Sequence, residues 1–313
     1  MVRLRKLTWK HIDLEIRVAD GTHVRVVGRP GLWMPPQEQL RLVEELRSVV
    51  SETVDHGVLD YGVLTGDQER LDNGILTILY ESETGRPVAF NAMMLMRLLI
   101  RGRPQDVLHL GLVVVDPAFR SRGLSWVLYG LSVLLLSFRK QLRPLWISNV
   151  TQVPAVVGMV TDSFTGVFPT ARNARRSYDH LDIARQILRD HRHIFGVGPD
   201  AGFDFDRFII TNAYTGGSDN LKKSFAVAPK HRDEIHNEFC VTSLDYDRGD
   251  DFLQIGQFTF ADARRYLLRS VPRGSLGSIL YHALFLAAGS IALPLIHWFT
   301  PGVQMGDLRP WRS

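Results

Sequence analysis

The chain has 313 residues, of which 45% are hydrophobic and 22% are charged, so it can bury the core of one or two domains. This composition excludes a disordered, collagen-like or coiled-coil protein as a description of the whole. The single cysteine, Cys240, excludes an internal disulfide framework and a cysteine-based zinc site, and it fits a reducing compartment. The net charge of +4 permits an anionic ligand or membrane surface, and we predict no nucleic-acid partner.

The N-terminal part of the chain begins with strand-like patterns. Its first ten residues include basic residues with no apolar run behind them, so no cleavable signal peptide is predicted. Residues 11–28 alternate in polarity around a turn signal at Asp20-Gly21 and predict a β-hairpin. Apolar residues at helical spacing predict a helix over 37–54.

The next stretch predicts the centre of a mixed sheet. Apolar runs at 75–81 and 87–96 indicate a second hairpin, and Val107–Val115 indicates a central strand with apolar residues on both faces. A buried helix, a short strand and a short helix are then expected over 124–138, 145–150 and 154–163. This order is typical of an α/β fold.

The sequence pattern changes after residue 170. Residues 171–193 predict an arginine-rich helix, 196–206 a glycine-containing loop, and 208–260 short strands with polar loops. The six arginines at 172, 175, 176, 185, 189 and 192 indicate a solvated helix face, or alternatively one that meets anionic lipid or a phosphate of a ligand.

A long apolar segment lies near the end of the chain. Residues 275–299 contain no Asp, Glu, Lys or Arg, and as a helix they are long enough to cross a hydrocarbon core of about 30 Å. Basic residues precede the segment, and Trp298 lies near its end. Two interpretations stay open, a membrane-associated helix and a helix buried in the protein or against a partner.

The residues after the central strand predict an anion site. The strand ends at Asp116-Pro117, a turn then holds Arg120, Arg122 and Gly123, and an apolar helix begins at once. Backbone N–H groups at the N-terminus of a helix have no partner within the helix and attract anions. Glycine lets the backbone approach a phosphate closely, and guanidinium adds charge and paired donors. A diphosphate would fit this turn.

This stretch, Arg120-Ser121-Arg122-Gly123-Leu124-Ser125, resembles the coenzyme A diphosphate motif of the GNAT superfamily of acyl-coenzyme A-dependent N-acyltransferases. The family motif ends in glycine or alanine, where this chain has Ser125. The resemblance covers about residues 40–170 and implies a mixed, mostly antiparallel central sheet flanked by helices. It also implies that Val113, Val115 and residues 120–125 bind the acyl-coenzyme A co-substrate, with the backbone near Val115 polarising the acyl carbonyl where the strand is splayed.

A second segment matches the family only in part. Aligning Ala155 with the family pattern puts Gln152 in the place of an asparagine and Met159 in the place of a tyrosine. In many family members that tyrosine protonates the departing thiolate, which a methionine cannot do. The role of general acid is therefore vacant or belongs to another residue.

The central strand offers one candidate base. His109 lies where arylalkylamine N-acetyltransferases also have a histidine, and an imidazole can accept a proton from an amine directly or through water. The alternative is a hydrogen-bonded histidine of the scaffold. Gly111 stands where other family members have Glu or His, and no carboxylate replaces it.

We predict no metal site. His180, His191 and His193 lie near aspartates, but residues two apart on a helix diverge. Four aspartates at 245, 247, 250 and 251 lack the spacing and the closing glutamate of a calcium loop, so we expect them on a solvated loop.

The sequence thus predicts an acyl-coenzyme A-dependent N-acyltransferase that acts on a primary amine. The apolar segment favours a long-chain donor or a lipid-like amine, as in enzymes that make N-acyl amino acids, ornithine lipids or ceramides, and a place at the cytoplasmic face of a membrane. The alternatives are a sensor that binds acyl-coenzyme A with weak or no catalysis, and a membrane-anchored interaction protein. The predicted organisation is an N-terminal hairpin extension (1–36), an acyl-coenzyme A-binding core (37–170), a C-terminal extension or lid (171–272) and the apolar helix (273–302).

Overall fold

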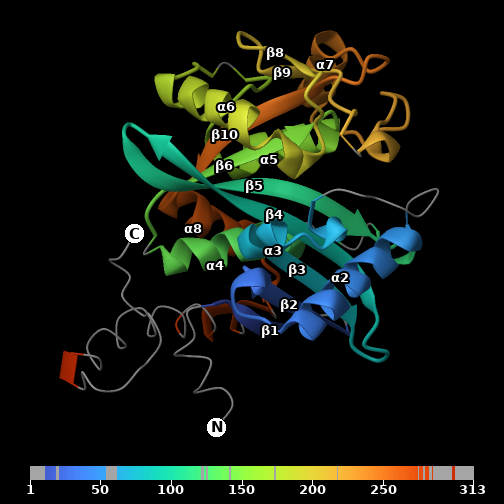
Figure 1. Ribbon diagram of the computed structural model, residues 1–313, viewed down its shortest axis with the longest axis vertical. Coiled ribbons are helices and arrows are strands. Elements are labelled where there is room, and N and C mark those ends of the chain that lie inside the picture. The colour runs from blue at the N-terminus through green and yellow to red at the C-terminus, as the bar shows by residue number, and fades with distance from the viewer. Residues whose placement is uncertain are drawn as a thin grey trace.

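The computed structural model describes residues 11–18, 21–53, 62–120, 123–124, 126–140, 142–172, 174–216, 218–273, 275–277, 279–281, 284 and 298–299. In this part of the chain one mixed sheet runs through the molecule, with helices on both faces (Figure 1). Its strands lie in the order β1-β2-β3-β4-β5-β6-β10-β9-β8, and β7 also pairs with β10. All neighbours are antiparallel except β5 and β6, so the predicted α/β class with a mostly antiparallel sheet is confirmed.

The strands are β1 (Asp13–Val18), β2 (Thr22–Gly28), β3 (Gly74–Glu81), β4 (Pro87–Ile100), β5 (Arg103–Val115), β6 (Leu145–Thr151), β7 (Thr165–Phe168), β8 (Gly202–Asp204), β9 (Ile209–Thr211) and β10 (Asp251–Phe258). The helices are α2 (Pro36–Ser51), α3 (Gln68–Asn73), α4 (Ser132–Arg139), α5 (Pro154–Ser163), α6 (Tyr178–Asp190), α7 (Glu234–Ser243) and α8 (Phe260–Arg269). A π-helical segment, η4 (Trp126–Leu131), leads directly into α4.

The first 170 residues follow the predicted order closely. Both hairpins, the central strand and the short helix α5 are confirmed, and β4 and β5 are longer than expected. The helix predicted over 171–193 begins only at Tyr178, because Ser177 and His180 form a capping box that fixes its N-terminus. The region expected to hold only short strands and polar loops also contains α7, whose first turn is capped by the Asp233 side chain.

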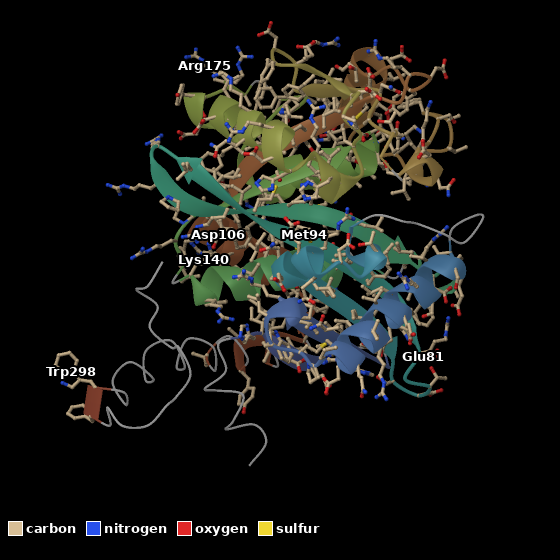
Figure 2. All side chains as sticks on the ribbon, viewed as in Figure 1. Glu81, Met94, Asp106, Lys140, Arg175 and Trp298 are labelled. Atoms are coloured by element: carbon tan, nitrogen blue, oxygen red, sulfur yellow. The ribbon has the colours of Figure 1, made fainter. Side chains whose placement is uncertain are left out.

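Each face of the sheet carries its own hydrophobic core. On one face α2 and α6 pack through residues such as Leu46 and Ile187, which are fully buried. On the other face, η4, α4 and α8 pack through residues such as Leu128, Leu134 and Ala263. An ion pair of 2.5 Å between Lys140 Nζ and Asp106 joins the end of α4 to the start of β5 (Figure 2). The helix α4 therefore brings the chain back to the end of the sheet where β5 begins. The next strand, β6, then runs parallel to β5.

The predicted apolar helix over 273–302 lies largely outside the described residues. Only 275–277, 279–281, 284 and 298–299 of the segment from 275 to 299 are described. Within the described part of the chain, no helix combines the length and the apolar character needed to cross a membrane.

A β-bulge in β5 shapes the centre of the sheet. Met94 lies opposite His109 and Ala92 lies opposite Leu112, so Leu110 and Gly111 of β5 together face Met93 alone. A Cβ atom at Gly111 would lie 1.8 Å from the carbonyl oxygen of Ala92, so only glycine fits there. The parallel pairing of β5 with β6 ends at His109, immediately before the bulge. Since a bulge bends the strand that carries it, β5 turns away from β6 at this point.

Replacing Gly111 by alanine therefore destabilises the protein. We expect the Gly111→Ala variant to lose roughly 1–3 kcal/mol of unfolding free energy, the usual cost of overpacking, when urea denaturation is compared with that of the wild type. Gly277→Ala is the matched control, because an added Cβ at Gly277 has no atom within 4 Å. Equal stability of the two variants would show that the bulge relaxes freely and would contradict this account.

Candidate functional site

A small cavity lies where β5 and β6 separate. Its volume is about 210 Å³, and both strands contribute to its wall. Apolar side chains form most of the wall, among them Met94, which lies near the middle of the molecule (Figure 2). The polar side chains that line the cavity are His109, Asn149, Tyr214, Ser218, Lys223 and Asp251 from five different segments, together with Thr151 and Tyr129.

The separation of the strands leaves one edge of β5 open to this cavity. The N–H of Asp116 donates to the Val88 carbonyl of β4 at 2.9 Å. Because successive backbone groups alternate between the two edges of a strand, the N–H groups of Val113 and Val115 face the other edge. Among the described residues, no strand pairs with that edge beyond His109. The open edge can thus donate hydrogen bonds to a ligand.

The exposed side chain of Arg120 turns back toward the same edge. Its Nε donates to the Val115 carbonyl at 3.2 Å, which satisfies one acceptor of the open strand end. Asp116, at the start of the turn, accepts the N–H of Ala118 and forms an ion pair with Arg86. The turn that follows β5 is therefore fixed by polar contacts on both sides.

His109 is buried at the inner end of the small cavity. Its Nδ1 lies 3.0 Å from the Ser148 hydroxyl, and its ring packs against Phe195 at 5.1 Å between centroids. Burial lowers the pKa of His109 to about 3, so the imidazole is neutral at physiological pH. A base with such a low pKa accepts protons weakly, and a catalytic role for His109 stays a prediction.

Asp251, the first residue of β10, is a buried carboxyl in the same wall. One of its carboxylate oxygens accepts a hydrogen bond of 3.0 Å from the Tyr214 hydroxyl. Burial raises the pKa of Asp251 to about 7, with a smaller contribution from the neighbouring Asp250. The expectation of a solvated aspartate loop is wrong for Asp250 and Asp251, which are both buried. A carboxyl that begins a largely apolar strand was the sequence signal for this position.

A second, larger cavity of about 920 Å³ opens beside Gly123 and η4. Four arginines and two aspartates, Asp162 and Asp262, line it. The arginines belong to α8 and to the segments that follow α5 and precede α7. Basic side chains therefore outnumber acidic ones by two. The four arginines are Arg172, Arg232, Arg265 and Arg269.

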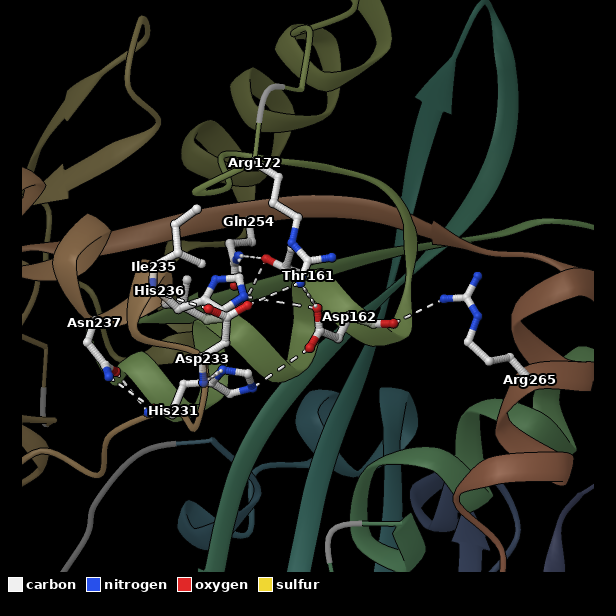
Figure 3. Close-up of polar contacts among 11 residues, drawn as sticks. Thr161, Asp162, Arg172, His231, Asp233, Ile235, His236, Asn237, Gln254 and Arg265 are labelled. Carbon is white, nitrogen blue, oxygen red and sulfur yellow. Dashed lines mark hydrogen bonds and ion pairs between the residues drawn. The ribbon is translucent and has the colours of Figure 1, made fainter.

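Asp162, near the end of α5, organises part of this basic wall (Figure 3). Its carboxylate forms an ion pair of 3.0 Å with Arg172 and lies 3.8 Å from Nε2 of His231. Arg265 donates to its backbone carbonyl at 3.0 Å. Arg232 and Arg269 make no ion pair with any described residue, so their charges are available to an anion.

The turn and π-helical segment between the two cavities are held by side chains from distant strands and helices. Gly123 has a φ of 69°, a left-handed conformation that favours glycine. The Trp126 carbonyl accepts the Tyr266 hydroxyl at 2.7 Å, and the Leu128 carbonyl accepts the Asn91 side chain at 2.7 Å. These contacts engage backbone carbonyls of η4, and π-helical segments of this kind often occur at functional sites.

Tyr129 of η4 lines both cavities. Burial raises the pKa of its phenol, so the group stays protonated over the physiological range. No sequence pattern pointed to Tyr129 as a cavity residue, because it lies inside an apolar run. Met159, which the alignment with the GNAT pattern puts in the place of a tyrosine, lines the larger cavity.

The predicted site residues are brought to one region. His109 and Val113 line the small cavity, Gly123 lines the large one, Val115 lies between Val113 and Gly123 in sequence, and Leu124 follows Gly123 directly. Ser121, Arg122 and Ser125 lie outside the described residues. Of the six arginines at 172–192 that were considered as anion ligands, Arg172 lines the large cavity.

A comparison of the chain with known protein-family models and with curated protein sequences finds no match.

The raised pKa of Asp251 makes the stability of the fold depend on pH. The folded protein holds this proton more tightly than the unfolded chain, so the stabilisation is complete below an ordinary carboxyl pKa of about 4 and is lost as the pH rises to about 7. Relative to Asp251→Asn, the wild type should lose up to about 1.4 kcal/mol of unfolding free energy per pH unit in this window. Above pH 8 the difference should be constant.

Urea denaturation at pH 5, 6, 7 and 8 measures this difference. Asp247→Asn, which alters an exposed carboxyl of the same loop, is the control and should follow the wild type at every pH. Parallel curves for the wild type and Asp251→Asn would contradict a raised pKa at Asp251.

Proposed function

We propose that this protein is an acyl-coenzyme A-dependent N-acyltransferase. The observation that carries the proposal is that Tyr129 lines two cavities, a large one with four arginines in its wall and a small one with the buried carboxyl of Asp251 in its wall. A basic cavity suits a polyanionic thioester, and a separate small cavity suits the amine that reacts with it. The resemblance of residues 120–125 to the GNAT motif supports the same assignment.

The large cavity suits a coenzyme A thioester. Its volume is near the top of the range of roughly 300–1,000 Å³ that is usual for small-molecule sites. The diphosphate would lie at the Gly123 turn, and Arg232 and Arg269 would pair with phosphate oxygens. The thioester would then extend along η4 toward Tyr129, which also lines the small cavity.

The open edge of β5 supplies what the acyl group requires. The N–H groups of Val113 and Val115 face the gap between the strands and can donate to the thioester carbonyl oxygen, on which negative charge develops during attack. Backbone donors fixed in a sheet lose little entropy when they bind this oxygen. The transfer is direct, because Cys240, the single thiol of the chain, is buried away from both cavities.

Tyr129 is the candidate for the general acid that protonates the departing thiolate. Met159 cannot fill this role, because a methionine side chain has no proton to give. As the amine nitrogen bonds to the carbonyl carbon, the C–S bond breaks and the sulfur leaves with the electron pair. Tyr129 lines both cavities, and its hydroxyl would donate a proton or a hydrogen bond to this sulfur.

Binding of coenzyme A tests the large cavity. Gly123→Glu adds bulk and negative charge at the diphosphate and should abolish binding measured by calorimetry, whereas Arg269→Ala should weaken it about tenfold, the loss of one charge-assisted contact of roughly 1.5 kcal/mol. Arg41→Ala, an exposed arginine on α2, is the control and should bind as the wild type does. Unchanged affinity in both Gly123→Glu and Arg269→Ala would refute this site.

Removal of the Tyr129 hydroxyl tests the chemical step. Tyr129→Phe should slow release of the coenzyme A thiol by roughly 10²-fold, the usual contribution of a general acid, while the affinity for coenzyme A stays the same. The assay offers acetyl-coenzyme A and palmitoyl-coenzyme A with a panel of primary amines, and it compares the two donors directly. The exposed Tyr178 of α6 provides the control, Tyr178→Phe. An unchanged rate in Tyr129→Phe would exclude this role.

A sensor of acyl-coenzyme A is the second candidate function. The observation that favours it is the weak basicity of His109 combined with the loss of the family tyrosine at Met159. The same assay separates the two functions, because a sensor binds the thioesters and releases no thiol with any amine.

A further inference from the structure

The small cavity has one anionic side chain, Asp251, in a wall that is mostly apolar. Asp251 is 4% exposed and lines the cavity together with apolar residues such as Val113, Val150 and Phe195. A carboxylate in such surroundings lacks the solvation that water would give it. A cation that enters the cavity would supply the missing charge partner.

The other charged and titratable groups near Asp251 leave this role to a ligand. Asp250 is already paired with Arg248 through two hydrogen bonds. Tyr214 and Tyr246 are phenols, of which Tyr214 donates to Asp251 and Tyr246 donates to the Gln152 carbonyl. His109 is neutral, and Lys223 lies exposed at the cavity and forms no ion pair among the described residues.

We propose that the small cavity binds the ammonium group of the acceptor amine, and that the Asp251 carboxylate is both its ion-pair partner and the acceptor of its first proton. This inference rests on the proposed function and names the substrate class of the same site. The fixed hydrogen bond from Tyr214 orients the carboxylate, and the second carboxylate oxygen is the one that meets the ligand.

The size and lining of the cavity define the amine further. A cavity of about 150 Å³ lined by apolar side chains accommodates benzene, and this one measures about 210 Å³. It therefore holds a primary amine with an aromatic or short aliphatic substituent of about that size. A longer substituent must extend past the exposed rim near Lys223.

The protons balance as follows. The ammonium loses one proton to Asp251, and its lone pair then attacks the thioester carbonyl carbon. When the C–N bond has formed and the C–S bond breaks, the Tyr129 hydroxyl gives its proton to the departing sulfur, and the second proton of the nitrogen passes to the Tyr129 oxygen, which restores the phenol. The products are the amide, the coenzyme A thiol and one proton, which passes from Asp251 to solvent.

Titration calorimetry with benzylamine and its neutral counterpart benzyl alcohol tests the inference on the full-length protein. Benzylamine is a cation at both pH 6 and pH 8, whereas Asp251 changes from about one-tenth to about nine-tenths ionised if it titrates near pH 7. The wild type should therefore bind benzylamine about tenfold more tightly at pH 8 than at pH 6. Benzyl alcohol should show no such dependence.

Variants give the matched comparison. Asp251→Asn keeps the shape of the side chain and should weaken benzylamine binding at pH 8 at least tenfold and remove its pH dependence. Asp247→Asn, with its exposed carboxyl in the same loop, should behave as the wild type does. The pH dependence of the wild type is a test that needs no variant, so a folding defect in Asp251→Asn does not prevent the measurement.

Several results would overturn the inference. They are equal binding of benzylamine and benzyl alcohol, the same affinity at both pH values, unchanged binding in Asp251→Asn, and no binding of benzylamine at all. Coenzyme A binding in the same preparation separates this failure from that of the proposed function. Retained coenzyme A binding without an amine site refutes the inference alone, and an amine site without coenzyme A binding refutes the proposed function.

Discussion

The contact between the Cα of Gly111 and the carbonyl of Ala92 is the constraint on which the centre of the molecule depends. It permits two residues of β5 to face one residue of β4, and the strand then bends away from β6. The bend opens one backbone edge and creates the space that Asp251 and His109 line. It also explains why no glutamate or histidine occupies position 111, since a side chain there has no room.

Burial shifts the pKa values of His109 and Asp251, which both line this space, in opposite directions. Burial disfavours the charged form of each group. It therefore lowers the pKa of the His109 imidazole to about 3 and raises the pKa of the Asp251 carboxyl to about 7, where the carboxyl exchanges protons readily. The same desolvation thus makes one group a poor base and the other a suitable one. Both groups are buried. Which of them can take a proton from an amine therefore depends on whether the group is an imidazole or a carboxyl.

The first 170 residues could be predicted well because their apolar patterns are local and their turns carry clear signals. The hairpins at 11–28 and 75–96 and the helix α5 follow directly from such patterns. The candidate site was only half predictable. The Gly123 turn lies within one short segment, but Asp251 and Arg269 reach the site through strand pairing and helix packing between distant segments. The one local signal at Asp251 was its place at the start of a largely apolar strand, and that signal alone does not show that the carboxyl lines a cavity.

The position of β10 has a consequence for how the chain folds. This strand lies between β6 and β9, although 99 residues separate it from β6 in sequence. During synthesis the edge of β6 that pairs with β10 therefore stays unpaired until residue 258 has emerged. The hydrogen bond from the Tyr266 hydroxyl to the Trp126 carbonyl can form only after that. Pairings between such distant segments are slow to form, and an unpaired strand edge invites association with other chains. The nascent chain is thus most vulnerable in the interval before β10 docks, when its first six strands can already be in place.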